Sequence, residues 1–221
     1  MKFAKSLVIA LSLGILVNLV SAQEVKINSN LAIEADGTVR MDNTAMVWDD
    51  LRVTLDKGSS SAILDWVSGS SGSQIWFFRW NAAEEAMSFT VQLPHNWKEG
   101  TTIYPHLHWL PKTTASGNVE WIFEYSWANY NATTPVAFPA ATTITVTSTG
   151  PFTANTHRIQ SLTTGDAGLT GTGQLISSIL ICRIWRNGTR PNDTYDADAG
   201  VLFLDFHYQL DTFGSRDVFT K

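Results

Sequence analysis

The sequence has a single cysteine and no complete set of catalytic residues. Cys182 is alone among 221 residues, so the chain can form no intramolecular disulfide. It stands in an apolar segment with Ile181 and Ile184, which predicts a buried and inert thiol. The sequence contains neither a G-x-S-x-G nucleophile motif nor a glycine-rich phosphate loop. We therefore expect a non-catalytic protein without a cofactor, stabilised by a packed core.

Basic clusters and long apolar runs are also scarce. Fifteen Lys and Arg against 20 Asp and Glu give a net charge of −5, which argues against nucleic acid as a partner. The long apolar run, Ser6–Val20, follows Lys2 and Lys5 and precedes small residues. This layout predicts a secretory signal peptide over residues 1–22, and hence a secreted or cell-surface protein that does not associate with the membrane after cleavage. A retained anchor is the alternative, but the run is shorter than the ~20 residues that span a bilayer.

Aromatic residues and short alternating segments are abundant. There are nine tryptophans and eleven phenylalanines, and each such ring can bury roughly 150–250 Å². Apolar and polar residues alternate, and Gly, Asn, Pro, Ser and Thr interrupt them at short intervals, which is typical of all-β proteins. The candidate strands lie within residues 24–41 (two strands), 45–55, 73–80, 87–93, 101–110, 118–128, 142–148, 157–162, 174–186 and 201–210.

This series of short strands predicts an all-β fold, an antiparallel β-sandwich of the jelly-roll type spanning residues 45–221. A short N-terminal extension, residues 23–44, precedes it and contains a β-hairpin at the Asp36-Gly37 turn. A division into two domains at the Thr-rich stretch 133–150 is the alternative. Each half would then be small and would lack a disulfide, so one domain is the better interpretation.

Four segments carry a resemblance to a known group of proteins: "VWDDLRVTL", "FTVQLPHNWKEGTTIYPHLHW", "VEWIFEYSWAN" and "DFHYQLDTFGSRDVFTK". They resemble parts of uncharacterised phage and prophage proteins that are associated with virion-surface or tail-associated β-sandwich domains. The resemblance covers most of residues 45–221 and identifies no reaction. It implies a structural or attachment role and a homo-oligomer, with a trimer as the form suggested by analogy. The signal peptide departs from this group, because virion proteins assemble in the cytoplasm.

The segment "YPHLHW" contains the residues most typical of a metal site. Side chains alternate between faces along a strand, so Tyr104, His106 and His108 share one face. If this segment paired with residues 118–128 as a hairpin, with the aromatic faces together, glutamates of the second strand would lie beside the histidines. A late strand in which Asp205 and His207 share a face would complete the cluster. The candidate ligands for a divalent metal are therefore His106, His108, Glu120, Glu124 and His207.

A cupin-like metal-dependent enzyme using His106 and His108 is one function that follows from this cluster. The spacing from Gly100 through the two histidines is similar to the first half of the cupin motif. The glutamate that should follow is absent, and the second half of the motif is not visible. An ordinary strand surface is the alternative that we favour.

The acidic stretch "NDTYDADAG" and the tryptophans suggest two further sites. Asp193, Asp196 and Asp198 are candidate calcium ligands, although their spacing differs from that of an EF-hand and a polar turn explains them equally well. Trp97, in a polar turn, is the ring that we expect to be most exposed, and with Tyr104 it is a candidate for ligand binding. Such rings stack on sugars, so a lectin-like module with a glycan or cell-surface partner is an alternative function. The other tryptophan positions favour the core or a subunit interface.

Overall fold

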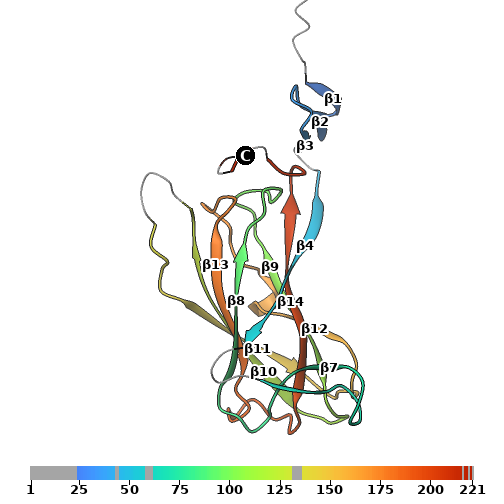
Figure 1. The fold of residues 1–221 in the computed structure, drawn as a ribbon. Coiled ribbons are helices and arrows are strands. Elements are labelled where there is room, and N and C mark those ends of the chain that lie inside the picture. Colours follow the sequence, from blue (N-terminus) through green and yellow to red (C-terminus); the bar gives the residue numbers. More distant parts are fainter. Residues whose placement is uncertain are drawn as a thin grey trace, which may run out of the picture.

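The computed structural model describes residues 24–42, 45–57, 62–130, 136–215, 217–218 and 220. The predicted signal peptide lies outside these residues. Within them the chain is built almost wholly of antiparallel strands, with one short 3₁₀ turn, η1 (Thr164–Asp166) (Figure 1). The predicted all-β fold is confirmed. No helix in the described part of the chain is long and apolar enough to span a bilayer.

The strands follow the expected segments closely. Their bounds are β1 (Val25–Asn28), β2 (Leu31–Ile33), β3 (Val39–Met41), β4 (Val47–Val53), β5 (Asp56–Lys57), β6 (Ile63–Trp66), β7 (Gln74–Phe78), β8 (Glu85–Gln92), β9 (Tyr104–Pro111), β10 (Asn118–Ala128), β11 (Thr142–Thr149), β12 (Arg158–Ser161), β13 (Ile179–Arg186) and β14 (Ala199–Leu210). The sequence pattern missed β5 and β6, which are short and flank the Ser/Gly-rich stretch.

The strands form three sheets. Sheet A is the meander β1-β2-β3, sheet B has the order β12-β9-β14-β7-β6, and sheet C has the order β11-β10-β13-β8-β5. Strand β4 belongs to sheet B as well, because it pairs with the second half of β14 while β7 pairs with the first. Sheet A lies at one end of the molecule, beyond the start of β4 and the end of β14 (Figure 1).

Sheets B and C pack face to face around one aromatic core. The ring of Trp109 in β9 meets that of Trp121 in β10 edge-on, with 5.4 Å between centroids. Phe89 of β8 likewise packs against Phe206 of β14 at 6.4 Å. Aromatic packing of this kind replaces the disulfides that the chain lacks.

Two-residue alternation decides which side chains enter this core. In β8 every second residue is buried, from Glu85 to Val91, while Ser88, Thr90 and Gln92 face outward. In β10 the aromatic side with Trp121 and Phe123 is fully buried. Glu120 and Ile122 on the opposite side are buried as well, so this part of the strand is covered on both faces.

The predicted hairpin between residues 101–110 and residues 118–128 is wrong. Strand β9 pairs with β12 and β14 in sheet B, whereas β10 pairs with β11 and β13 in sheet C. Residues 112–117 cross from one sheet to the other. Gly117 ends the crossing with φ +119°, and a Cβ there would lie 2.5 Å from the carbonyl oxygen of Thr194. Only glycine fits a position with that backbone angle and so little space.

Candidate functional site

The outer face of sheet B gathers aromatic, imidazole and carboxylate side chains on three adjacent strands. The strand register brings them together, because His106 is opposite Asp205, His108 is opposite Phe203, and Tyr104 is opposite His207. Strand β4 adds Asp50 opposite His207 and Arg52 opposite Asp205. We call this surface the histidine face; it consists of Trp48, Asp50, Arg52, Tyr104, His106, His108, Phe203, Asp205 and His207.

Asp205 is the centre of one half of the histidine face. It is 5% exposed, and its Oδ2 lies 3.1 Å from Nε2 of His108, while its Oδ1 lies 3.5 Å from Nδ1 of His106. His157, just before β12, places its Nε2 2.8 Å from Nδ1 of His108. Because a carboxylate only accepts hydrogen bonds, His108 donates to Asp205 through Nε2 and accepts from His157 through Nδ1. The three side chains thus form a directed chain of hydrogen bonds.

Burial sets the protonation of His108. Loss of hydration lowers the pKa of His108 below its ordinary value of 6.5 and outweighs the opposing attraction of Asp205; the nearby His157 and His106 lower it further. His108 is therefore neutral at pH 7, in agreement with the hydrogen-bond directions. Its ring also stacks on Phe203, with 4.1 Å between centroids.

The second half of the histidine face is more open. Nδ1 of His207 lies 2.7 Å from Oδ1 of Asp50, and both side chains remain partly exposed. The indole of Trp48 stacks on the His207 ring at 4.9 Å, with only 5° between the planes, and Tyr104 lies 5.9 Å from the same indole. Trp48 is 38% exposed. This half of the face therefore presents an oriented aromatic ring next to groups that donate and accept hydrogen bonds.

The predicted metal cluster does not form. His106, His108 and His207 do share one surface, as expected, and the rings of His106 and His207 are 6.3 Å apart. Glu120 and Glu124 lie on β10 in the other sheet. The alternation that turns the aromatic sides of β9 and β10 toward each other turns the histidines and the glutamates to opposite outer faces of the sandwich.

The two glutamates have partners of their own. Glu120 is buried and is contacted by Arg190 and Asn192, while Glu124 is contacted by Arg183. Among the described residues, no group of three or more His, Cys, Asp or Glu has an arrangement that could hold a metal ion.

The predicted calcium loop is organised by an arginine. Arg186, fully buried at the end of β13, forms two hydrogen bonds to the Asp193 carboxylate, of 2.8 and 2.6 Å. The same guanidinium donates to the carbonyl oxygens of Ala197, at 2.6 Å, and Tyr195. Asp196 is exposed and Asp198 accepts a bond from the backbone of Trp80, so the three aspartates do not converge. Of the three candidate calcium ligands, Arg186 thus binds one, Asp193.

The exposure predicted for Trp97 is also wrong. Its side chain is fully buried, and its ring packs against Trp127 at 6.0 Å. The turn that carries it folds back over the end of the sandwich, where Trp97 forms a bridge with Leu210. Burial of a large ring outweighs the polarity of its sequence neighbours. Tyr104, the other candidate, does lie on a partly exposed surface, the histidine face.

The sequence pattern missed four members of the histidine face, namely Trp48, Asp50, Arg52 and Phe203, and the adjoining His157. Each belongs to a segment that was predicted as a strand. These segments are distant in sequence from the strand with His106 and His108, so their proximity to it could not be inferred. The sequence did offer one signal for this site: Asp205 and His207 are two residues apart in a predicted strand, so both side chains lie on the same face.

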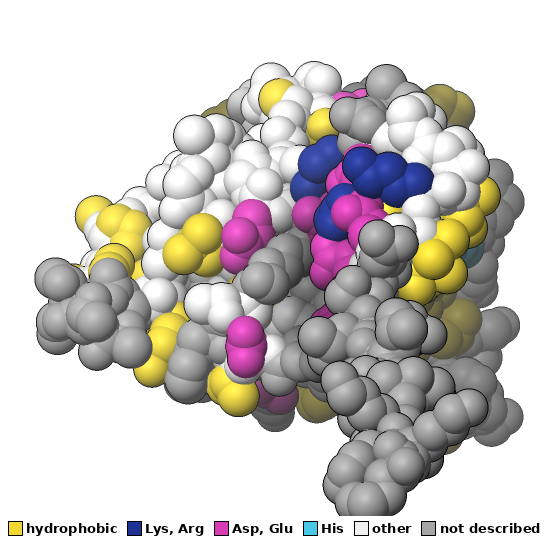
Figure 2. Space-filling model, turned by 90° about the horizontal axis from the view of Figure 1, so that it is seen from above, with side chains coloured by type: hydrophobic (Ala, Val, Ile, Leu, Met, Phe, Trp, Pro, Cys, Tyr) yellow, Lys and Arg dark blue, Asp and Glu magenta, His cyan; other side chains and the backbone are white. Residues whose placement is uncertain are grey.

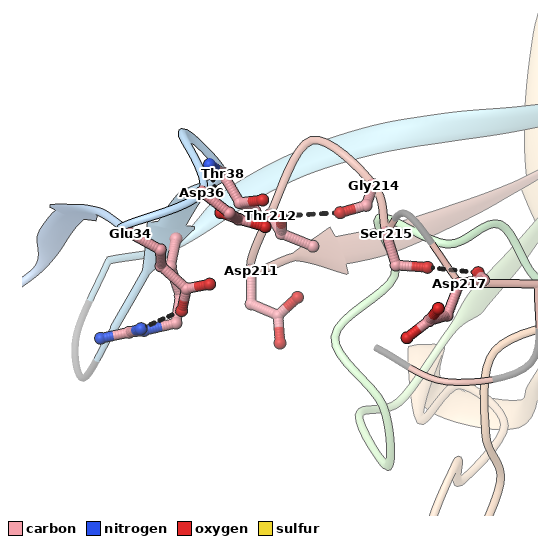
Figure 3. A pocket seen from close by; sticks show the side chains of 9 residues that line it. Glu34, Asp36, Thr38, Asp211, Thr212, Gly214, Ser215 and Asp217 are labelled. Atoms are coloured by element: carbon pink, nitrogen blue, oxygen red, sulfur yellow. Dashed lines mark hydrogen bonds and ion pairs between the residues drawn. The ribbon is translucent and has the colours of Figure 1, made fainter. Parts of the chain in front are cut away.

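An acidic cavity of about 390 Å³ lies between sheet A and the segment after β14. Glu34 and Asp36 from the β2–β3 turn and Asp211 and Asp217 from the C-terminal segment lie around it (Figure 3). Arg40 also lines the cavity and pairs with Glu34, so the charge of Glu34 is compensated. Figure 2 shows this end of the molecule, with basic side chains gathered among acidic ones and hydrophobic side chains beside them.

Comparison with known proteins gives no family. No family model matches the chain, and no curated protein matches it. Among solved structures, the chain is similar to a chain in the one titled "Structure of infectious bursal disease virus Gx strain", with a TM-score of 0.37 and 10% sequence identity. The match covers 78% of this chain and 34% of that one, so this chain spans about a third of the other's length. A similarity of this size carries no argument about function.

Proposed function

We propose that this chain is a secreted, non-catalytic β-sandwich with a structural or attachment role that works by binding through its surface. The proposal is carried by the histidine face, an open side of a sheet on which stacked rings and paired charges are already held in place. Binding surfaces are enriched in aromatic side chains of this kind, and rigid side chains lose little entropy when a partner binds. Secretion rests on the predicted signal peptide.

The strand order supports the prediction that the β-sandwich is of the jelly-roll type. Eight strands, β4 and β8 to β14, numbered 1 to 8 along the chain, lie in the orders 1-8-3-6 in sheet B and 2-7-4-5 in sheet C. We infer that this is the double Greek key of a jelly roll, a fold that occurs in capsid proteins and lectins as well as in cupins. Because one fold serves many functions, the order supports a structural or binding role only by analogy.

Carbohydrate binding is the second candidate, and the arrangement around Trp48 favours it. A sugar ring can stack on an exposed indole while its hydroxyl groups bond to neighbouring polar groups. Asp50 and His207 provide such groups directly beside Trp48, and Tyr104 extends the aromatic surface. Trp48 thus takes the place that the sequence pattern gave to Trp97.

The test is binding of the purified secreted protein to a glycan array and to immobilised cell-wall polysaccharides. Trp48→Ala is expected to lower binding at least tenfold. Trp80→Ala is the matched control, because Trp80 is 45% exposed but lies outside the histidine face. Equal loss in both variants, or no loss in Trp48→Ala, would contradict a role for the histidine face. Absence of binding to any carbohydrate would remove the second candidate.

A further inference from the structure

Four of the five histidines of the chain gather at the histidine face. His106, His108 and His207 project from the neighbouring strands β9 and β14, and His157 adjoins them from the segment just before β12. Histidine is the side chain whose ordinary pKa places its change of charge between pH 5 and 8. The charge of this surface therefore changes in a pH range in which carboxylates, lysines and arginines ordinarily keep theirs.

One buried acceptor on this surface is unused. Oδ1 of Asp205 is buried and has no hydrogen bond among the described residues. Nδ1 of His106 lies 3.5 Å from it, which is longer than a good hydrogen bond. A protonated imidazole carries a hydrogen on both ring nitrogens, so protonated His106 has a donor for this oxygen whichever neutral tautomer preceded it. Protonation thus gives the Asp205 carboxylate the partner that it lacks.

Two strands bring charged groups next to these imidazoles. Strand β14 provides Asp205 and His207, and the ring centroids of His106 and His207 are 6.3 Å apart. Strand β4 provides Arg52 and Asp50, whose Oδ1 lies 2.7 Å from Nδ1 of His207. The fixed charges of the histidine face are therefore one guanidinium and two carboxylates, of which the Asp205 carboxylate is buried.

The other described neighbours of these imidazoles are uncharged. Strand β12 places Ile159 and Ser161 opposite the two histidines of β9. Arg158 of the same strand points to the core instead, where its guanidinium lies 5.0 Å from the ring centroid of Phe152. Tyr104 adds a phenol, a group that is uncharged in mild acid. The charge of this surface in mild acid therefore depends chiefly on the imidazoles.

His108 keeps the geometry of the surface while the other imidazoles respond to acid. Burial lowers its pKa, and the neutral ring donates to Asp205 and accepts from His157. The side chains of His106 and His207 are more accessible, at 30% and 40% exposed, and His157 is exposed as well. His157 donates to His108 through Nε2, so a proton added at its Nδ1 leaves that hydrogen bond in place.

We propose that the histidine face binds an anionic polysaccharide in mild acid and releases it at neutral pH. With neutral imidazoles, the face and His157 carry one cation against two carboxylates. Protonation of the three accessible imidazoles gives four cations against the same two carboxylates, so the sign of the charge is reversed. An anionic ligand stabilises the protonated imidazoles, and it therefore binds more tightly as the pH falls.

Trp48 favours a sugar over other anions. Its indole is partly exposed and stacks on the His207 ring, with 4.9 Å between centroids. A sugar ring that packs on the exposed part of the indole brings its acidic substituents close to the imidazoles. The inference rests on the proposed binding role of the histidine face, and it adds the charge of the ligand and the proton that regulates binding.

The first test is binding of the purified protein to dextran sulfate and to unmodified dextran at pH 7.5 and pH 5.5, at constant ionic strength. We expect the affinity for dextran sulfate to be at least tenfold higher at pH 5.5, and that for dextran not to rise. His106→Gln combined with His207→Gln is expected to remove most of the rise. His95→Gln is the matched control and should retain it, because His95 bonds to Ser177 and Ser215 outside the face. No rise, or an equal rise in the double variant, would overturn the proposal.

A second measurement uses the unaltered protein and does not depend on the folding of a variant. Calorimetric titration with dextran sulfate at pH 6, in two buffers of different ionisation enthalpy, is expected to show net uptake of protons on binding. Binding without proton uptake would overturn the proposal. Polyphosphate has the charge but no sugar ring and is expected to bind at least tenfold more weakly, so equal binding would overturn the assignment of a polysaccharide.

The two proposals fail in distinguishable ways. Trp48→Ala tests binding to the face itself at pH 7.5, whereas the pH series with dextran sulfate tests its regulation. If Trp48→Ala abolishes binding to a neutral glycan while dextran sulfate binds equally at both pH values, the proposed function stands and this inference is wrong.

Discussion

Single residues in this protein have roles that their sequence neighbours do not reveal. Arg186 is fully buried, and the described hydrogen bonds of its guanidinium all go to oxygen: one carboxylate and two carbonyl groups. Trp97 stands among polar residues and is nevertheless in the core. In both cases the decisive partner is distant in sequence, so the environment of these residues could not be inferred from local composition.

Asp193 tests the role of the buried arginine. Asp193→Ala leaves the Arg186 guanidinium without its charge partner, and removal of one member of a buried pair costs roughly 3–5 kcal/mol. We expect a loss of that size in the free energy of unfolding measured with urea. Asp196→Ala is the control, because Asp196 is exposed, and its loss should stay below about 0.5 kcal/mol. Similar small losses in both variants would contradict the structural role.

His108 gives the stability a defined pH dependence. Burial lowers its pKa in the folded state, so the unfolded chain binds protons more readily. Stability is therefore expected to decrease as the pH falls below about 6.5, the unfolded value, toward the lower folded pKa. Urea unfolding between pH 7.5 and 5.0 should show a smaller decrease in His108→Gln than in the unaltered protein. An equal or larger decrease in that variant would contradict the assignment.

At the scale of elements, the sequence predicts strands and faces much better than it predicts pairing. Strand β10 begins and ends at the residues expected, and its aromatic side is buried. Alternation is a local property and is visible in a single segment. Whether β9 pairs with β10 or faces it across the core depends on the crossing at residues 112–117, and either arrangement buries the same rings. The metal prediction failed at this point. The histidines and the glutamates do lie on the sides of β9 and β10 that alternation predicts, but the two strands are in different sheets, so these side chains do not meet.

Gly117 tests the crossing between the sheets. Gly117→Ala places a Cβ 2.5 Å from a backbone oxygen at φ +119°, and such strain costs about 1–3 kcal/mol or more. We expect a lower midpoint in thermal unfolding. Gly37→Ala is the control, because Gly37 also has a positive φ but has open space around its Cα. A Gly117→Ala variant as stable as Gly37→Ala would show that the close approach to Thr194 does not constrain the chain.

For the whole molecule, composition and alternation were sufficient to predict an all-β protein with an aromatic core. The surfaces required the structure. The histidine face combines β4, β9 and β14, which are distant in sequence. The account that results is a sandwich for which we propose one polar and aromatic contact surface, on the outer face of sheet B.

The most direct test of the proposed binding surface is an NMR titration of protein labelled with ¹⁵N in its histidines. Of the five histidines, His106, His108 and His207 lie on the histidine face and His157 adjoins it, whereas His95 bonds to Ser177 and Ser215 elsewhere. On addition of the carbohydrate that binds best on the array, we expect the imidazole signals of the first four to shift while those of His95 stay unchanged. Saturating binding that shifts only His95, or none of the five, would contradict the account.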